Sequence, residues 1–142
     1  ERHNHTMPVP YVPYGQDATV AFGAKDLKFR NTTGSDIMIW AQGVGNILYI
    51  AFYGSKRGPD VEWYHEVLEV RKAPVKFKTN PELAPGEEKK VLEGMDGAVV
   101  KSWVTISRDG DVEVKFMGIS DYKPMPHIIE RGPRKLGLFF LS

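Results

Sequence analysis

Alternation of apolar and polar residues is the main pattern along this chain, and it predicts short β-strands. In residues 36–41, Ile37 and Ile39 share one face of an extended segment, while Met38 and Trp40 share the other. No stretch has the apolar periodicity that is typical of a helix of about ten residues or more. The further runs with strand character are residues 19–22, 26–29, 47–52, 61–70, 72–79, 98–107, 112–117 and 124–130.

Two pairs of these runs are predicted to form hairpins. Asp109-Gly110 stands between the runs at 98–107 and 112–117, and Asp-Gly between two alternating segments is a strong hairpin signal. The glycine-rich residues 43–46 join the two runs on either side of them in the same way. Consecutive strands are therefore expected to pair with each other.

Residues 61–70 can be interpreted in two ways. Trp63, Val67 and Val70 have spacings of three and four, which suit a helix. The β-branched and aromatic residues of this segment favour a strand, which is the interpretation we prefer. With that choice all the predicted elements are extended, and the fold class is mainly β.

The polar segment GSKRGPD, residues 54–60, is the best candidate for a boundary. It contains two glycines and one proline, and it separates two apolar patterns. We therefore predict two small β units joined by a short linker. The predicted divisions are residues 1–56, residues 61–135 and an apolar tail at residues 136–142.

Composition and charge exclude several classes of function. The 142 residues carry 19 basic and 18 acidic side chains, for a net charge of +1, so we expect no nucleic acid partner. The chain has no cysteine and therefore neither a disulfide nor a thiol nucleophile. No apolar run approaches the ~20 residues of a membrane helix, so no transmembrane segment is expected.

The opening of the chain contains a non-repetitive series that secondary structure alone does not explain. It consists of Glu1-Arg2-x-x-His5, Pro8-Val9-x-Tyr11-Val12-Pro13-x-Gly15-x-Asp17-Ala18-Thr19-Val20 and Asp26-Leu27-x-Phe29-x-Asn31. This series resembles the closing part of the VanW-like domain, over residues 1–54. The resemblance implies an exported protein of the Gram-positive cell envelope. Longer VanW-like domains have a preceding glycine-rich segment with a cysteine, which this sequence lacks, so chemistry that depends on that cysteine is absent from this chain.

A second series resembles the five-glycine extracellular domain that often follows VanW-like domains. It covers residues 66–133, and the resemblance implies a thin, single-layer β module with little conventional core. The second unit is therefore expected to be an elongated thin sheet, of a kind suspected of binding polymers that contain N-acetylglucosamine. The residues that carry this resemblance are Phe77-Lys78-Thr79, Gly86, Gly94-x-x-Gly97, Asp109-Gly110 and Pro126-x-Ile128-Ile129-x-x-Gly132.

The two resemblances together imply an extracellular or cell-wall-associated, non-catalytic protein. We expect it to bind peptidoglycan or another wall glycan and to self-associate through β-strand pairing. The alternative is the C-terminal part of a peptidoglycan-acting enzyme, with its nucleophile in an upstream segment. Residue 1 is glutamate and no basic-then-apolar leader is visible, so we expect either that earlier sequence was removed or that the chain is a fragment.

The histidines near the start are the candidates for metal binding and catalysis. In an extended arm His3 and His5 point the same way, and with Asp17 they could hold zinc. Two histidines are an incomplete site, so a structural or hydrogen-bonding role is the alternative and no cofactor is expected. His5 and Asp17 are also weak catalytic candidates, but the chain has no nucleophile motif such as G-x-S-x-G. The alternative for Asp17 is capping of a loop end.

Aromatic residues are the candidates for sugar stacking, because aromatic faces suit the apolar faces of pyranoses. Burial of these residues in a small β core is the alternative. The candidates taken from Tyr11, Tyr14, Trp40, Trp63, Tyr64 and Trp103 are Tyr11, Tyr14, Trp63 and Trp103.

The tail is the candidate for self-association. An apolar terminal strand can add to the sheet of another subunit, or it can pack back on its own chain. The residues concerned are Leu138, Phe139, Phe140 and Leu141.

Overall fold

A computed structural model describes residues 1–56 and 58–134, and within these ranges every helix or strand assigned is a β-strand. The fold is therefore mainly β, as the sequence predicted. The same ranges hold no helix with the length and apolar character that crossing a membrane requires. The strands are β1 (Ile37–Val44), β2 (Ile47–Gly54), β3 (Asp60–Arg71), β4 (Val75–Thr79), β5 (Glu88–Leu92), β6 (Gly97–Arg108), β7 (Asp111–Tyr122) and β8 (His127–Arg131).

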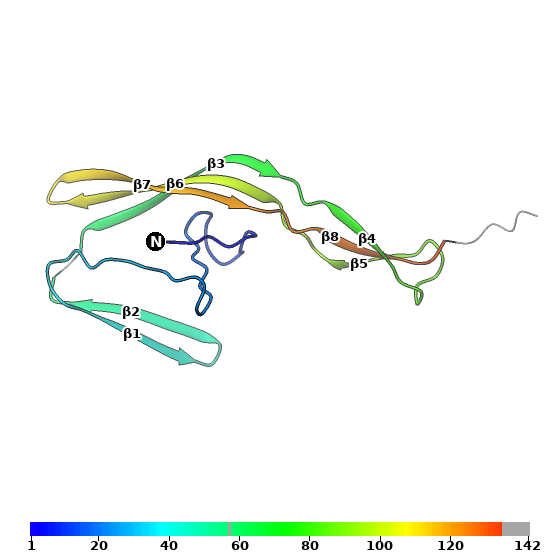
Figure 1. Ribbon diagram of the computed structural model, residues 1–142, viewed down its shortest axis with the longest axis horizontal. Coiled ribbons are helices and arrows are strands. Elements are labelled where there is room, and N and C mark those ends of the chain that lie inside the picture. The colour runs from blue at the N-terminus through cyan, green and yellow to red at the C-terminus, as the bar shows by residue number, and fades with distance from the viewer. Residues whose placement is uncertain (57, 135–142) are drawn as a thin grey trace, which may run out of the picture.

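The strands form three small sheets. A hairpin of β1 and β2 stands by itself, β3-β6-β7 form a central sheet, and β4-β8-β5 form a distal sheet. The central and distal sheets follow one another along the long axis of the molecule (Figure 1). Residues 1–35, here called the arm, lie beside the central sheet without regular strands. The second half is thus the elongated thin module that the sequence predicted.

Both predicted hairpins are present, and their turns have the expected backbone. Asp109 and Gly110 have φ angles of 51° and 92°, and two central residues with positive φ match the type I′ turn that Asp-Gly favours. In the β1–β2 hairpin Val44 pairs with Ile47, and Gly45 has a φ of 58°. Local turn chemistry therefore sets the register of both pairs.

Residues 61–70 lie in β3, so the strand interpretation was correct. The strands predicted at residues 19–22 and 26–29 were wrong. Ala21 and Lys25 form an isolated bridge around a turn, in which Gly23 has a positive φ of 74°. The backbone of the arm bonds instead to its own first residues, with the Thr19 N–H donating to the His3 carbonyl at 2.7 Å. Apolar content alone did not reveal this looped path.

The core lies on one face of the central sheet. Ala98, Val100, Ser102 and Val104, which alternate along β6, are all at most 6% exposed. Tyr122 at the end of β7 is 1% exposed and packs in the same cluster. We call this covered face the inner face and the opposite face the outer face. A single buried face explains why so few apolar side chains are buried.

The central and distal sheets meet where two connections cross at very short range. Met95 and Met125 exchange backbone hydrogen bonds of 2.9 and 2.8 Å. A Cβ atom on Gly94 would lie 2.3 Å from the Met125 carbonyl oxygen, and one on Gly97 would lie 2.5 Å from the Tyr122 carbonyl oxygen. Both positions need glycine because backbone atoms occupy the space of a side chain.

Gly97→Ala is expected to lower the free energy of unfolding by about 3 kcal/mol, since the neighbouring backbone has no room to relax. The matched control is Gly43→Ala in β1, where nothing lies within 4 Å of the added Cβ, and a change within about 0.5 kcal/mol is expected there. Urea unfolding followed by tryptophan fluorescence measures both. Equal midpoints for the two variants would contradict the close-approach argument.

Candidate functional site

The arm is held on the inner face by hydrogen bonds to the end of β7. Arg2 donates to the Ser120 hydroxyl at 2.8 Å, and the Asn4 side-chain amide donates to the Asp121 carbonyl at 3.2 Å. The Lys123 N–H donates to the Thr6 carbonyl at 2.7 Å. Segments more than a hundred residues apart in sequence are thereby joined into one structural unit.

Asp17 is the centre of this contact, and it is 3% exposed. One of its carboxylate oxygens accepts from the His5 backbone N–H at 2.6 Å and lies 2.9 Å from His5 Nδ1. The other oxygen accepts from the Tyr122 hydroxyl, which itself accepts from the Gly15 N–H at 2.9 Å. The guanidinium of Arg2 lies 3.7 Å from the same carboxylate. A buried charge with this many partners is well compensated.

These contacts set the protonation of both buried groups. Burial alone would raise the pKa of Asp17, but the hydrogen bonds from Tyr122 and from His5 outweigh it and hold that pKa below its ordinary value. Burial, and then the hydrogen bond to Asp17, raises the pKa of Tyr122. At neutral pH the pair is therefore a carboxylate that accepts a hydrogen bond from a protonated phenol.

The two candidate metal ligands of the arm contact different carboxylates. His5 Nδ1 faces Asp17, whereas His3 Nε2 lies 3.1 Å from Glu1 Oε1. Within residues 1–56 and 58–134, no group of three or more histidine and acidic side chains is arranged to hold a metal ion. The structure thus pairs His5 with Asp17 but does not bring His3 to them.

Of the four aromatic candidates, Tyr14 and Trp63 lie on the inner face. Tyr14 packs on Tyr122 with ring centroids 5.5 Å apart, and the Trp63 indole N–H is buried without a partner in the structure. Tyr11 is 69% exposed and meets the edge of the His5 ring at 6.4 Å. These three side chains do not share a surface with Trp103.

Trp103 belongs to a row of aromatic side chains on the outer face. The register pairs it with Tyr64 on β3 and with Phe116 on β7, so one aromatic residue from each strand lies side by side. The rings of Tyr64 and Trp103 are nearly parallel, with centroids 6.0 Å apart and planes at 12°. Tyr64 and Phe116 are 40% and 59% exposed. We call these three residues the aromatic row.

Polar side chains flank the aromatic row on both sides. Lys101 and Glu66 are cross-strand partners in the next row of the outer face, and the Lys101 ammonium lies 5.7 Å from the centre of the Trp103 ring. On the other side Glu62 accepts a 2.5 Å hydrogen bond from the Tyr64 hydroxyl. Donors and acceptors are therefore available around an apolar strip.

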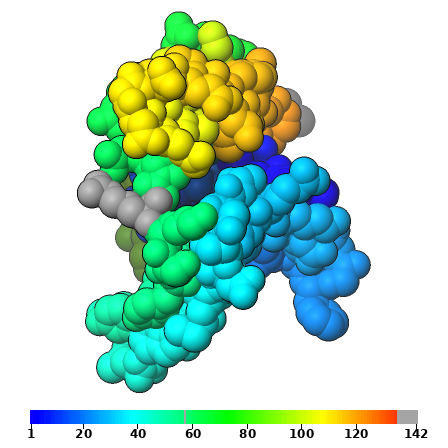
Figure 2. Space-filling model, turned by 90° about the vertical axis from the view of Figure 1, so that its left-hand side faces the viewer, coloured from blue at the N-terminus to red at the C-terminus, as the bar shows by residue number. Residues whose placement is uncertain are grey.

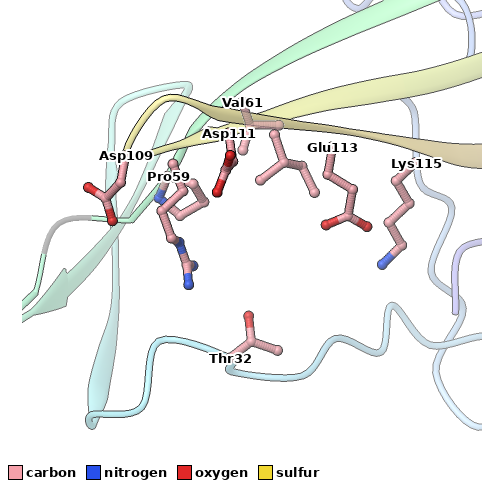
Figure 3. Close-up of a pocket in the computed structure, with 9 residues that line it drawn as sticks. Thr32, Pro59, Val61, Asp109, Asp111, Glu113 and Lys115 are labelled. Carbon is pink, nitrogen blue, oxygen red and sulfur yellow. The ribbon is translucent and has the colours of Figure 1, made fainter.

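A broad hollow of about 630 Å³ lies at the β6–β7 turn, opposite the arm residue Thr32 (Figure 3). Glu113 and Lys115 project into it from β7, and Asp109 and Asp111 stand at its end. Opposite charges lie together in this open hollow, and no aromatic side chain lines it. It is a less suitable sugar site than the aromatic row.

Sequence patterns missed parts of both sites. Period-two alternation places Tyr64 opposite to its neighbour Trp63, so the two cannot contact one ligand on one face, and this signal could have selected Tyr64. Phe116 and Tyr122 needed the pairing of β6 with β7. The tail candidates Leu138, Phe139, Phe140 and Leu141 lie outside the described residues.

Comparison with known proteins identifies the arm and the hairpin. Residues 1–53 match the family model described as VanW like protein. These residues are a VanW-like segment. The chain is also 44% identical over 55 residues, 39% of its length, to the uncharacterized protein YoaR of Bacillus subtilis (strain 168). It spans only 18% of that relative.

Two solved structures named as G5 domains are similar to the chain. The IgA1 protease G5 domain is 25% identical, with a TM-score of 0.34 over 58% of this chain and 100% of its own. The HP0197 G5 domain is 16% identical, with a TM-score of 0.31 over 51% of this chain and 99% of its own. The sequence predicted this resemblance next to the VanW-like segment. Both TM-scores are below 0.5, so neither structure bears on what this chain binds.

Asp17→Asn is expected to loosen the arm. Because the native pKa of Asp17 is lowered, its stabilisation is complete above the ordinary carboxyl range of about pH 4 and is lost as pH falls through the native pKa. The variant should therefore lose about 1–3 kcal/mol at pH 7 and show a smaller loss of stability in acid.

Urea unfolding across pH 2–8 (roughly the range of carboxyl titration) measures this difference. Asp26→Asn, an exposed aspartate of the same arm, is the control and should follow the unmodified protein. Parallel pH profiles for Asp17→Asn and the unmodified chain would exclude Asp17 as the anchor.

Proposed function

We propose that this chain is a non-catalytic binding module of an exported cell-envelope protein, and that its ligand is peptidoglycan or another wall glycan. The observation that carries the proposal is the aromatic row on the outer face. The VanW-like segment supports a role in the envelope. The anchored arm contributes by covering the inner face, which leaves the outer face as the accessible side of the central sheet.

The chemistry of the aromatic row suits a sugar polymer. Sugar rings present an apolar C–H face and a rim of hydroxyl groups, and they stack on flat aromatic side chains. Tyr64, Trp103 and Phe116 supply the flat surface on three adjacent strands. Glu66 and Lys101 supply hydrogen-bonding groups beside it. A row across a rigid sheet needs little reorganisation on binding, which favours affinity.

Tyr64→Ala is expected to weaken retention on purified peptidoglycan about tenfold, which is the loss of roughly 1.4 kcal/mol from one stacking contact. The matched control is Tyr49→Ala on β2, a tyrosine of similar exposure at 49%, and it should bind as the unmodified chain does. Co-sedimentation with peptidoglycan at a series of concentrations gives the affinities. No retention of the unmodified chain, or equal losses in both variants, would refute the proposal.

A second candidate function is favoured by one specific observation. His5 Nδ1 faces the buried Asp17 carboxylate at 2.9 Å, and an imidazole oriented in this way can act as a general base through Nε2. Its nucleophile would belong to a segment outside residues 1–142. This is the alternative of a peptidoglycan-acting enzyme, with His5 as base and Asp17 as its orienting acid.

The enzyme alternative is tested with a longer protein that contains this chain. If it is correct, such a protein releases soluble fragments from purified peptidoglycan, and His5→Gln abolishes the release while the neighbouring His3→Gln keeps it. Chromatography of the soluble fraction measures the fragments. Absence of release, or full activity of His5→Gln, would remove this alternative.

A further inference from the structure

The β1–β2 hairpin has an unusual surface for a protein segment exposed to water. Residues 37–54 contain no charged side chain. Large apolar side chains nevertheless cover both of its faces, and ten of them are at least 39% exposed. These ten are Met38, Ile39, Trp40, Val44, Ile47, Leu48, Tyr49, Ile50, Phe52 and Tyr53.

The described part of the chain covers very little of this hairpin. No other strand of the described residues packs against β1 or β2, and the hairpin stands away from the β6–β7 end of the molecule (Figure 2). Phe29 of the arm touches one face, with its ring centroid 5.9 Å from that of Phe52, and is itself 58% exposed. A two-stranded hairpin alone is only marginally stable in water, so this one requires a partner.

The edges of the hairpin are as open as its faces. In the described chain β1 pairs only with β2, so each strand has one row of backbone N–H and C=O groups outside the ladder. Natural sheets protect such edges with charged residues, proline or bulges. Residues 37–54 contain neither charge nor proline, and the pairing is regular over all eight positions. This edge is suited to strand addition.

The free edges also decide between two apolar partners. A lipid bilayer could cover the apolar side chains, but it offers no hydrogen bonds to open sheet edges, which do not occur in hydrocarbon. A β-strand from protein satisfies the edge and covers the faces at the same time. An uncharged edge meets no repulsion from an identical edge, and two copies can pair about a two-fold axis.

We propose that the β1–β2 hairpin is a self-association site, at which the hairpin of a second copy of this chain adds edge to edge to form a continuous four-stranded sheet. This site is distinct from the tail residues 136–142 and from the aromatic row. It provides two copies of the aromatic row in one particle, which would raise the avidity for a repeating polymer.

The oligomeric state of the full chain tests this proposal. Sedimentation over about a hundredfold range of protein concentration should show a dimer that dissociates on dilution. The double variant Tyr49→Lys, Ile50→Lys should be monomeric throughout, because like charges meet across the new pairing. The charge-matched control is Val112→Lys, Val114→Lys on the exposed face of β7, and it should keep the dimer. A monomeric unmodified chain, or loss of the dimer in the control alone, would overturn the proposal.

Single cysteines distinguish ordered pairing from adhesion or from local unfolding of the charged variant. Because the chain has no cysteine, Leu48→Cys, Ile50→Cys and Phe52→Cys each report on one position of β2. Oxidation should give a disulfide dimer readily at one of them and poorly at the others, whereas Val114→Cys should remain monomeric. Equal crosslinking at all four positions would contradict edge pairing.

Vesicles of phosphatidylglycerol and phosphatidylcholine test the competing partner. The unmodified chain should remain in the supernatant after centrifugation with vesicles. Binding of a monomer to vesicles that is lost in the Tyr49→Lys, Ile50→Lys variant would assign the hairpin to a membrane and overturn self-association. The glycan proposal is unaffected by these results, because it is measured separately on peptidoglycan.

Discussion

The buried carboxylate of Asp17 is the interaction on which the arrangement of the two halves depends. It joins the backbone and ring of His5 to the hydroxyl of Tyr122, and so it connects the opening of the chain with the end of β7. A thin sheet has only one face on which to bury apolar surface. The arm completes that core, and a charged group inside it is tolerated because each oxygen has a partner.

This anchoring gives the two faces of the central sheet different roles. The inner face is consumed by packing against Tyr14 and the glycine-containing loop of the arm. The outer face remains open and presents Tyr64, Trp103 and Phe116 in one row. Anchor and binding surface are thus opposite sides of the same strands, so a ligand on the outer face would meet a surface whose backbone is already fixed.

The hairpin β1–β2 shows the opposite situation. It belongs to the VanW-like segment, yet the described chain gives it neither a second layer nor a third strand. Local signals were sufficient to form it, since Gly45 supplies the turn and the alternation supplies the register. Its apolar faces and open edges nevertheless remain uncovered, and this unmet requirement is the physical basis for expecting a second copy there.

The sequence alone determined the features that depend on neighbouring residues. These are the mainly β class, the turns at Asp109-Gly110 and Gly45, the strand at residues 61–70 and the resemblance of residues 1–54 to a VanW-like domain. Tertiary structure alone decided which distant segments meet: the parallel pairing of β4 with β8, the looped path of residues 19–29, and the contact of Asp17 with Tyr122. Period-two alternation shows which residues share a face but not which face is covered. Only the packed arm therefore separated Trp63, beneath it, from Trp103 on the exposed side.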